Sequence, residues 1–314
     1  SAIRSIAEKV GCNAETLRLW VRRLERDRGA RPGLTTDERD RLKALEREKI
    51  EVVIEKNFLE LIHLNKTVTR DYCHFSTFKE LDSSYDLFFS IGGDGTILKS
   101  INYIRDLQIP ILGINTGRLG FLATVNKEEI RNTIDKLLRK EYHLSERSLL
   151  CIETEPSDNG FGDKSFALNE VAVNRKNTTS MITIETWLDG EYLTAYWADG
   201  LIISTPTGST GYSLSCGGPV ITPSTKALAI TPIAPHNLNA RPLIIKDNTR
   251  ITLKVSGREN EYLVSLDARI ATLQNNTIIN IKKAPFKIKM VEFRGDSFLK
   301  TLRQKLLWGE DKRN

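Results

Sequence analysis

The spacing of apolar residues changes near residue 145. Before it, a continuous apolar run at 86–91 leads into a glycine turn, an amphipathic helical pattern at 97–107 and a second apolar run at 110–117. Continuous short apolar runs on either side of a helix are typical of parallel strands with both faces buried. We therefore predict a parallel strand–helix–strand unit here, with a further short strand at 49–56.

After residue 145, apolar and polar residues alternate with a period of two in successive segments. Turn sequences such as Asp189–Gly190 and Ser256–Gly257 separate the segments, which is typical of antiparallel strands. The pattern predicts a β-rich domain at 145–285, packed on an α/β domain at 49–144. A leucine-rich helical stripe near the end predicts a C-terminal helix, within 286–314, that returns to the α/β domain.

Residues 1–48 follow a different pattern. Apolar residues recur at helical spacing in 17–24, opposite several arginines and after a turn at Gly11, and the stretch SIAEKVGCNAETLRLWVRRLERDRG resembles the N-terminal helix–turn–helix of small transposase subunits from insertion elements. Its second helix could enter a DNA major groove, although an arginine-rich solvated helix surface gives the same pattern. We expect an extra helical segment, foreign to the rest of the chain, whose contact with DNA is an alternative and not the main function.

Composition limits the classes of protein to consider. Of 314 residues, 40% are hydrophobic and 27% are charged, as in an ordinary globular protein, and the net charge is +6. No apolar run reaches the roughly 20 residues that a membrane span needs, so we expect no membrane partner. The four cysteines lie far apart without metal-ligand spacing, which argues against a zinc site or a disulfide framework and favours a reducing cytoplasm.

The turn after the first apolar run reads GGDGT, residues 92–96, and places one acid among three glycines. Gly92, Gly93 and Gly95 permit a close approach to phosphate, and the start of the next helix offers free N–H groups to an anion. Asp94 would repel a phosphate unless it binds a metal or accepts a proton from an attacking hydroxyl. A tight turn with Asp94 as the helix N-cap explains the same residues, and their spacing does not choose between the two interpretations.

Two further polar stretches interrupt the β-rich region. Asn169 and Glu170 lie side by side in an apolar strand, where burial is unfavourable unless partners satisfy them. The second stretch, ADGLIISTPTGSTGYSLSCGGP at 198–219, can present hydroxyl and amide groups to sugar and phosphate oxygens, and Tyr212 offers a ring on which a base can stack. A turn rich in serine and threonine is the simpler interpretation of this stretch taken alone.

Together, GGDGT, the Asn–Glu pair and DGLIISTPTGSTGYSLSCGGP closely resemble the signatures of NAD kinases, in that family's order and separation. The resemblance runs from about residue 50 to 314 and points to Bacteroidetes-type bacteria. It implies a Rossmann-like α/β nucleotide-kinase domain followed by a β-rich, sandwich-like domain that binds NAD. It also implies transfer of the γ-phosphate of ATP to the 2′-hydroxyl of the adenosine ribose of NAD, giving NADP, by a cytoplasmic homodimer or homotetramer with Mg²⁺ as the expected divalent metal.

The resemblance also implies roles for individual residues. Asp94 matches the acid that activates the acceptor hydroxyl, and Gly95 and Lys99 match ligand-binding positions beside it. Asn169 and Glu170 match the pair that reads the adenine edge and the ribose hydroxyls. Other positions match contacts to the dinucleotide, namely Asp199, Thr207, Thr210, Gly211, Tyr212, Ser213, Leu214, Ser215 and Arg269. Many members carry alanine at the position of Gly211, and some carry glutamine at the position of Arg269.

The chain departs from the family pattern at its start. In the family, a strand and a helix precede the segment at 49–56, and here residues 1–48 replace them. The lost strand normally lies next to the GGDGT strand, so its loss would uncover backbone hydrogen-bonding groups and apolar surface.

Two other functions stay open at this point. A lipid kinase shares GGDGT but lacks the combination of ALNEV and TPTGSTGY, and a DNA-binding fusion protein with an inert kinase part would bind duplex DNA in a salt-dependent manner.

Overall fold

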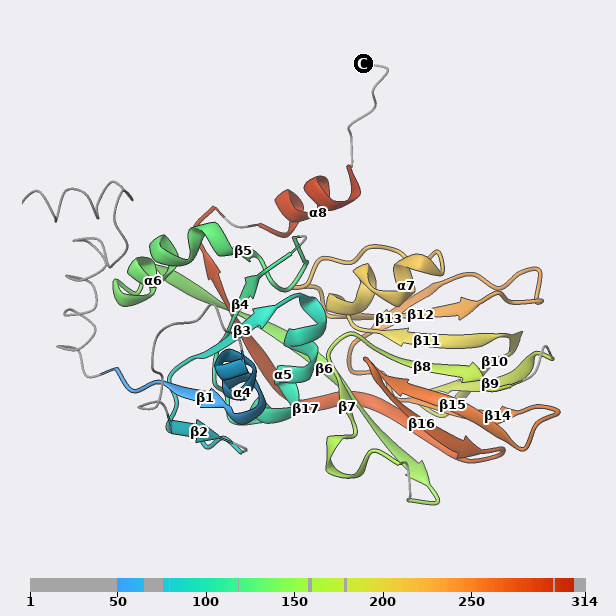
Figure 1. The fold of residues 1–314 in the computed structure, drawn as a ribbon. Coiled ribbons are helices and arrows are strands. Elements are labelled where there is room, and N and C mark those ends of the chain that lie inside the picture. Colours follow the sequence, from blue (N-terminus) through green and yellow to red (C-terminus); the bar gives the residue numbers. More distant parts are fainter. Residues whose placement is uncertain are drawn as a thin grey trace, which may run out of the picture. The chain divides into compact units, whose positions relative to one another are not determined.

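The computed structural model describes residues 50–64, 76–78, 80–117, 119–157, 160–177, 180–295 and 297–307 (Figure 1). The chain forms two compact units that divide after residue 79. The helix–turn–helix expected within residues 1–48 lies outside the described residues. No helix in the described ranges is long and apolar enough to cross a membrane.

The described part of the first unit contains a parallel strand pair and a helix. β1 (Val53–Glu55) pairs with β2 (Ser76–Phe78), and α4 (Lys56–Leu64) follows β1 directly. The strand predicted at 49–56 is therefore shorter than expected. It ends at Glu55 because this carboxylate accepts a hydrogen bond from the N–H of Phe58 at 2.9 Å, as a helix-capping side chain does.

The second unit begins with the predicted parallel strand–helix–strand. β3 (Phe88–Gly92) and β4 (Ile111–Asn115) pair in parallel, and α5 (Asp94–Ile104) connects them. Ile97 and Ile101, four residues apart on α5, are buried in a core cluster that includes the first residue of β4. This spacing gives the helix one apolar face and explains why the segment is helical.

The expectation that the first apolar run is buried on both faces is wrong. β3 ends the strand order of its sheet within the part of the chain that is described, and the side chains of Phe89 and Ile91 are 42% and 44% exposed. Alternate side chains of a strand point to opposite faces. Ser90 therefore points to the other face, where it is buried and its Oγ lies 3.2 Å from the Oγ of Ser100 on α5.

Two sheets build the rest of the unit. A nine-stranded sheet has the order β10-β9-β14-β17-β4-β3 with β5, β6 and β7 beside this path, and a six-stranded sheet has the order β13-β12-β11-β8-β15-β16. The remaining strands are β5 Val125–Asn126, β6 Tyr142–Glu155, β7 Phe166–Ala167, β8 Glu170–Arg175, β9 Ile182–Leu188, β10 Glu191–Ala198, β11 Gly200–Ser204, β12 Ala227–Ile233, β13 Leu243–Lys246, β14 Ile251–Ser256, β15 Glu261–Leu266, β16 Arg269–Gln274 and β17 Ile278–Phe293. The short helices are η1 Lys127–Glu129, α6 Ile130–Leu138, η2 Gly162–Lys164, η3 Thr207–Thr210 and α7 Tyr212–Ser215.

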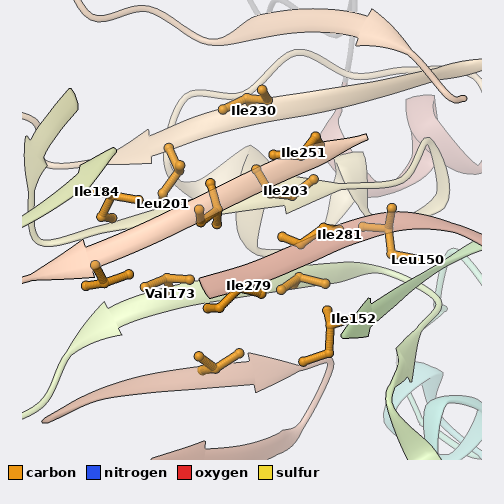
Figure 2. Packing of buried hydrophobic residues seen from close by; sticks show 14 of the residues in the cluster. Leu150, Ile152, Val173, Ile184, Leu201, Ile203, Ile230, Ile251, Ile279 and Ile281 are labelled. Atoms are coloured by element: carbon orange, nitrogen blue, oxygen red, sulfur yellow. The ribbon is translucent and has the colours of Figure 1, made fainter. Parts of the chain in front are cut away.

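Figure 2 shows the core between the two sheets. Ile184, Ile251 and Ile279 of the nine-stranded sheet lie in one buried cluster with Val173 and Leu201 of the six-stranded sheet. Since alternate residues of each strand face this core, the period of two in the sequence is the pattern of a sheet packed on a sheet. The fold class, an α/β part followed by a β-rich, sandwich-like part, is thereby confirmed.

The end of the chain differs from the prediction. Residues 286–293 belong to β17, which pairs with β6, whereas the sequence predicted them to lie in the segment of the C-terminal helix. Their sequence, FKIKMVEF, alternates apolar and charged residues, and this alternation is that of a strand. The helix itself, α8 (Phe298–Leu306), begins after Ser297 and packs by Phe298 on Phe121, with ring centroids 6.0 Å apart.

Candidate active site

The carboxylate of Asp94 lies on a turn formed by residues 121–123. Oδ2 accepts the N–H of Phe121 at 2.8 Å, and Oδ1 accepts the N–H groups of Leu122 and Ala123, both at 3.0 Å. The N-cap of α5 is Gly93, and no side chain caps that end of the helix. The interpretation of Asp94 as a helix N-cap is therefore wrong. We call residues 121–123 the Asp94-held turn.

Two glycines make room for this arrangement. A Cβ on Gly120 would lie 1.9 Å from Oδ1 of Asp94, and a Cβ on Gly92 would lie 2.2 Å from Oγ1 of Thr96. Gly92 also has φ +152°, which side chains rarely adopt. The sequence singled out Gly92, for approach to a phosphate rather than for room beside Thr96, and it missed Gly120, whose only signal was its place in the family-like stretch ILGINTGRLGFLA.

The side of α5 next to Asp94 is open. A carboxylate has about four lone-pair sites, and the three N–H bonds leave one of them free on Oδ2. Gly95 is exposed with no neighbouring atom where a Cβ would be, and Lys99, one helical turn later on the same face, is exposed as well. An anionic ligand can therefore approach Asp94 beside Lys99.

A second acid holds the Asn–Glu pair. Asp267, in the turn between β15 and β16, accepts the N–H groups of Leu168 at 2.9 Å, Asn169 at 2.7 Å and Glu170 at 3.3 Å. We call residues 168–170 the Asp267-held turn. The sequence did not predict a role for Asp267, because its partners lie 97 to 99 residues away in the chain.

Glu170 and Asn169 each keep a buried atom without a partner among the described residues, namely Oε2 of Glu170 and Oδ1 of Asn169. Burial, together with the nearby Asp267 carboxylate, raises the pKa of Glu170 to about 8, and the N–H of Tyr212 opposes this shift. Burial also raises the pKa of Asp267, against its three N–H donors and Arg269. Because Asp267 has three donors and Glu170 one, Asp267 is the ionised member when the pair holds a single proton.

The hydroxyl-rich loop of 205–215 packs directly on the Asp267-held turn. A Cβ on Gly208 would lie 2.1 Å from the carbonyl oxygen of Asn169, and the nearest atom to a Cβ on Gly211 would be Oε2 of Glu170 at 3.2 Å. The ring of Tyr212 is exposed and its hydroxyl lies 3.5 Å from Oδ1 of Asn174. Glycines in this loop therefore allow the backbone to approach the Asn–Glu pair.

The other residues predicted from the family resemblance divide into two groups. Thr210, Leu214 and Ser215 are at least partly accessible on the loop. Thr207 is buried, and the Oγ of the buried Ser213 lies 2.8 Å from Oγ1 of Thr231, so this hydroxyl already has a partner within the protein.

Asp199 and Arg269 have protein partners of their own. Oδ2 of Asp199 lies 3.3 Å from the guanidinium of Arg175, and the carboxylate is close enough to Tyr212 to help burial raise the pKa of that phenol. The guanidinium of Arg269 donates to the carbonyl oxygens of Lys164 and Phe166 and lies 5.1 Å from the centre of the Phe166 ring. Burial lowers the pKa of Arg269. Arg269 therefore connects β16 to the strand before the Asn–Glu pair.

One hydrophobic core supports both turns. Leu122 and Ala123 of the Asp94-held turn, Leu168 of the Asp267-held turn and Ile97 of α5 belong to the same buried cluster. The segments that carry Asp94 and the Asn–Glu pair thus pack into the same core.

Two family models match the chain. The N-terminal domain of ATP-NAD kinases matches residues 29–142, and the C-terminal domain matches residues 168–293. The NAD kinase of Christiangramia forsetii is 69% identical over 273 residues, which are 87% of this chain and 93% of that protein. The chain belongs to the NAD kinase family. As an NAD kinase, it carries the GGDGT turn and the Asn–Glu pair within the matched ranges.

Solved structures agree with this family in fold. Yeast NADH kinase complexed with NADH has a TM-score of 0.72 and 24% identity, and covers 86% of this chain and 82% of its own. An NAD kinase from Archaeoglobus fulgidus in complex with ATP has a TM-score of 0.62 and 24% identity, and covers 81% of this chain and 96% of its own. The expected NAD kinase is confirmed, whereas these comparisons support neither the lipid kinase nor the DNA-binding fusion. The family match begins at residue 29, inside the segment predicted to be foreign.

Proposed function

We propose that this NAD kinase transfers the γ-phosphoryl group of ATP to the 2′-hydroxyl of the adenosine ribose of NAD, with Asp94 as the proton acceptor. The observation that supports Asp94 is its three N–H bonds, which fix the carboxylate and leave one lone-pair site on Oδ2. A base must lie within hydrogen-bond reach of the proton that it accepts. A ribose hydroxyl that donates to this site is oriented for attack.

The reaction then needs one bond exchange. The 2′ oxygen bonds to the γ-phosphorus, the bond from that phosphorus to the β-phosphate oxygen breaks, and ADP leaves. The hydroxyl proton moves to Oδ2 of Asp94 as negative charge develops on the 2′ oxygen. Free N–H groups at the start of α5 and the exposed Lys99 are suited to the phosphate oxygens beside Asp94.

The Asn–Glu pair and the loop beside it supply the site for the adenosine part of NAD. Oδ1 of Asn169 and Oε2 of Glu170 lack partners in the described part of the protein, and NAD hydroxyl and amino groups would satisfy them. The exposed ring of Tyr212 offers a surface for the base. We assign Thr207, Thr210, Gly211, Ser213, Leu214 and Ser215 to the surrounding loop, Asp199 and Gly95 to further contacts, and Arg269 to the support of the pair.

The described residues do not form a complete set of ligands for a divalent metal. Among them, no group of three or more His, Cys, Asp and Glu side chains is arranged so that it could hold a metal ion. Mg²⁺ at phosphoryl-transfer sites is usually held by one or two carboxylates together with substrate phosphates. We therefore propose that Mg²⁺ is held mainly by the phosphates of ATP, where it would offset the charge of the transferred group.

We further propose a homodimer or homotetramer that works in the cytoplasm, as the family resemblance implies. The free thiols of Cys151 and Cys216 are compatible with a reducing compartment. We keep the domain division at 49–144 and 145–285 as a proposal, with residues 1–48 as an additional segment.

A coupled assay tests the proposed function. The chain is incubated with NAD, ATP and Mg²⁺, and NADP is detected with an NADP-specific dehydrogenase while ADP is measured in parallel. We expect equal amounts of NADP and ADP, and neither product after removal of Mg²⁺ by a chelator. ADP formation without NADP, or ADP formation that depends on added diacylglycerol, would contradict the proposal.

A further inference from the structure

The backbone of the Asp267-held turn is fixed on both sides. Its three N–H groups donate to the carboxylate of Asp267. Its carbonyl oxygens accept hydrogen bonds as well: Leu168 from Oγ1 of Thr205 at 2.6 Å, Asn169 from the N–H of Thr205 at 2.9 Å, and Glu170 from the N–H of Asp267 at 3.1 Å. Every backbone N–H and C=O of the turn thus has a partner, and the turn cannot rotate without breaking several of these bonds.

The side chains of Asn169 and Glu170 on this turn, unlike its backbone, are not fully hydrogen-bonded. Oδ1 of Asn169 and Oε2 of Glu170 are buried and lack hydrogen-bond partners among the described residues. Unpaired buried polar atoms are unfavourable in the free protein. They gain the most from a ligand when they are already aimed at it, because the protein then loses little freedom on binding.

From this contrast we propose that Asp267 is a positioning residue for the dinucleotide: it fixes the backbone of residues 168–170 so that Asn169 and Glu170 meet NAD already oriented. The inference rests on the proposed function of this site. Asp267 acts through Asn169 and Glu170, and it does not need to touch NAD itself.

Aspartate fits this task and asparagine does not. Its carboxylate accepts hydrogen bonds and donates none, whereas an asparagine would replace one oxygen by a donor group. With the amide oxygen at the position of Oδ1, the N–H of Leu168 would face this new donor and lose its acceptor. The backbone of Asp267 has φ +53°, and asparagine tolerates this region as well as aspartate does. Asp267→Asn therefore changes the hydrogen bonds and charge while keeping the preferred backbone conformation.

The first test compares Asp267→Asn with Asp247→Asn in the full chain. Asp247 is a buried aspartate that pairs with Lys283, and its ion pair does not involve the Asp267-held turn, so its variant controls for a general loss of stability. We expect Asp267→Asn to raise the KM for NAD about tenfold or more, because a buried donor loses its partner, and to change the KM for ATP less than about threefold. Asp247→Asn should lower the melting temperature but leave the KM for NAD within about twofold. A folded Asp267→Asn variant with the wild-type KM for NAD would overturn the inference.

The pH dependence of NAD binding gives a readout that lost stability alone would not move. The groups that act on the Glu170 carboxyl are Asp267 and the N–H of Tyr212, and Arg269 acts on Asp267. Removal of the Asp267 charge lowers the pKa of Glu170. We expect NAD affinity to show an inflection near pH 8 in the wild type, where Glu170 loses its proton, and this inflection should move to lower pH in Asp267→Asn. An unmoved inflection would count against the role of Asp267.

Hydrogen exchange on the wild-type chain tests the inference even if Asp267→Asn does not fold. The amides of residues 168–170 should be strongly protected before NAD is added, and NAD should change their exchange less than about threefold. Rapid exchange in the free protein that slows only with NAD would show that the ligand orders the turn, and would overturn the inference. Absence of NADP formation by the wild-type chain would instead refute the proposed function, so the two failures are distinguishable.

Discussion

The Asp94-held turn and the Asp267-held turn share one hydrogen-bond pattern and use it in opposite ways. In each, a single aspartate accepts the N–H groups of three consecutive residues. At residues 121–123 the three N–H groups fix the carboxylate of Asp94, which we propose is the group that reacts. At residues 168–170 the carboxylate of Asp267 fixes the backbone, and we propose that the neighbouring side chains are the groups that bind NAD.

The difference lies in what surrounds each carboxylate. Asp94 starts a helix beside Gly93 and Gly95, where no atoms lie within 4 Å of a hypothetical Cβ. Asp267 also uses its own N–H within the turn, and burial raises its pKa. Each acid keeps one lone pair on Oδ2, so the contrast comes from the backbone around it: we expect the acid at the open helix start to take part in chemistry, and the acid whose own N–H closes the turn to fix its neighbours.

The largest difference between the two turns should appear when Asp94 is replaced. Asp94→Asn should lower kcat about 10²- to 10⁴-fold, because the proton acceptor is lost, and leave the Kd of NAD nearly unchanged. Steady-state NADP formation and calorimetric titration with NAD measure the two quantities. Asp106→Asn, an exposed aspartate just after the same helix, is the control and should behave like the wild type. A tenfold weaker Kd with an unchanged kcat would assign Asp94 to binding.

The second prediction disturbs the seat of Asp94 without changing the acid. Gly120→Ala should lower kcat about 10²-fold, since its Cβ would lie 1.9 Å from Oδ1 and displace the carboxylate. Gly117→Ala in the same loop, where no atom lies within 4 Å of a Cβ, should retain full activity. Equal activities of the two variants would show that the position of Asp94 is not critical.

The third prediction concerns the binding side of the comparison. Glu170→Ala should raise the KM for NAD about tenfold and the KM for ATP much less, because it removes the unpaired Oε2 that we propose binds the dinucleotide. Initial rates with either substrate varied provide both constants. A larger rise in the KM for ATP than in the KM for NAD would contradict the assignment of Glu170 to the NAD site.

The pKa of Glu170 also predicts how stability depends on pH. The native protein keeps this proton up to about pH 8, while the unfolded chain releases it above about pH 4.5, so Glu170 costs stability increasingly as pH rises through this window. Glu170→Gln removes this cost and should raise the melting temperature at pH 8 by about 5 °C. The difference should shrink to nothing near pH 4.5. Thermal unfolding at a series of pH values would detect it, and a lower melting temperature at pH 8 would contradict the shift.

The smallest effect should come from Gly211→Ala. A Cβ at this position would lie 3.2 Å from both Oε2 of Glu170 and the carbonyl oxygen of Gly208, so the neighbours need to shift only by a few tenths of an ångström, and φ −96° lies outside the left-handed region that favours glycine. We expect kcat and both KM values to stay within about threefold of the wild type. A tenfold rise in the KM for NAD would show that the loop and Glu170 fit more tightly than these distances indicate.

Much of the fold could be predicted because it depends on local periodicity. The apolar runs and the stripe of α5 predicted the parallel unit, and the period of two predicted the β-rich domain, whose sandwich-like form was implied by the family resemblance. The exposure of Phe89 and Ile91 could not be predicted, since it depends on which strands lie beside β3. Residues 286–293 were misplaced because the helical pattern of α8 was extended over a segment that alternates like a strand.

The site was predictable where function requires unusual residues. An acid between glycines and a polar pair in an apolar strand are rare enough to single out Asp94, Asn169 and Glu170. Gly120 and Asp267 do not stand out, because their partners are backbone N–H groups or side chains from distant parts of the chain. Residues that hold a site in place become visible only when folding has brought these parts together.

A crystal structure of this NAD kinase with NAD bound would test the central claim most directly. We predict that the 2′ oxygen of the adenosine ribose lies about 3 Å from Oδ2 of Asp94, while the three N–H bonds from residues 121–123 persist. A ribose whose 2′-hydroxyl points away from Asp94, beyond hydrogen-bond reach, would contradict the account.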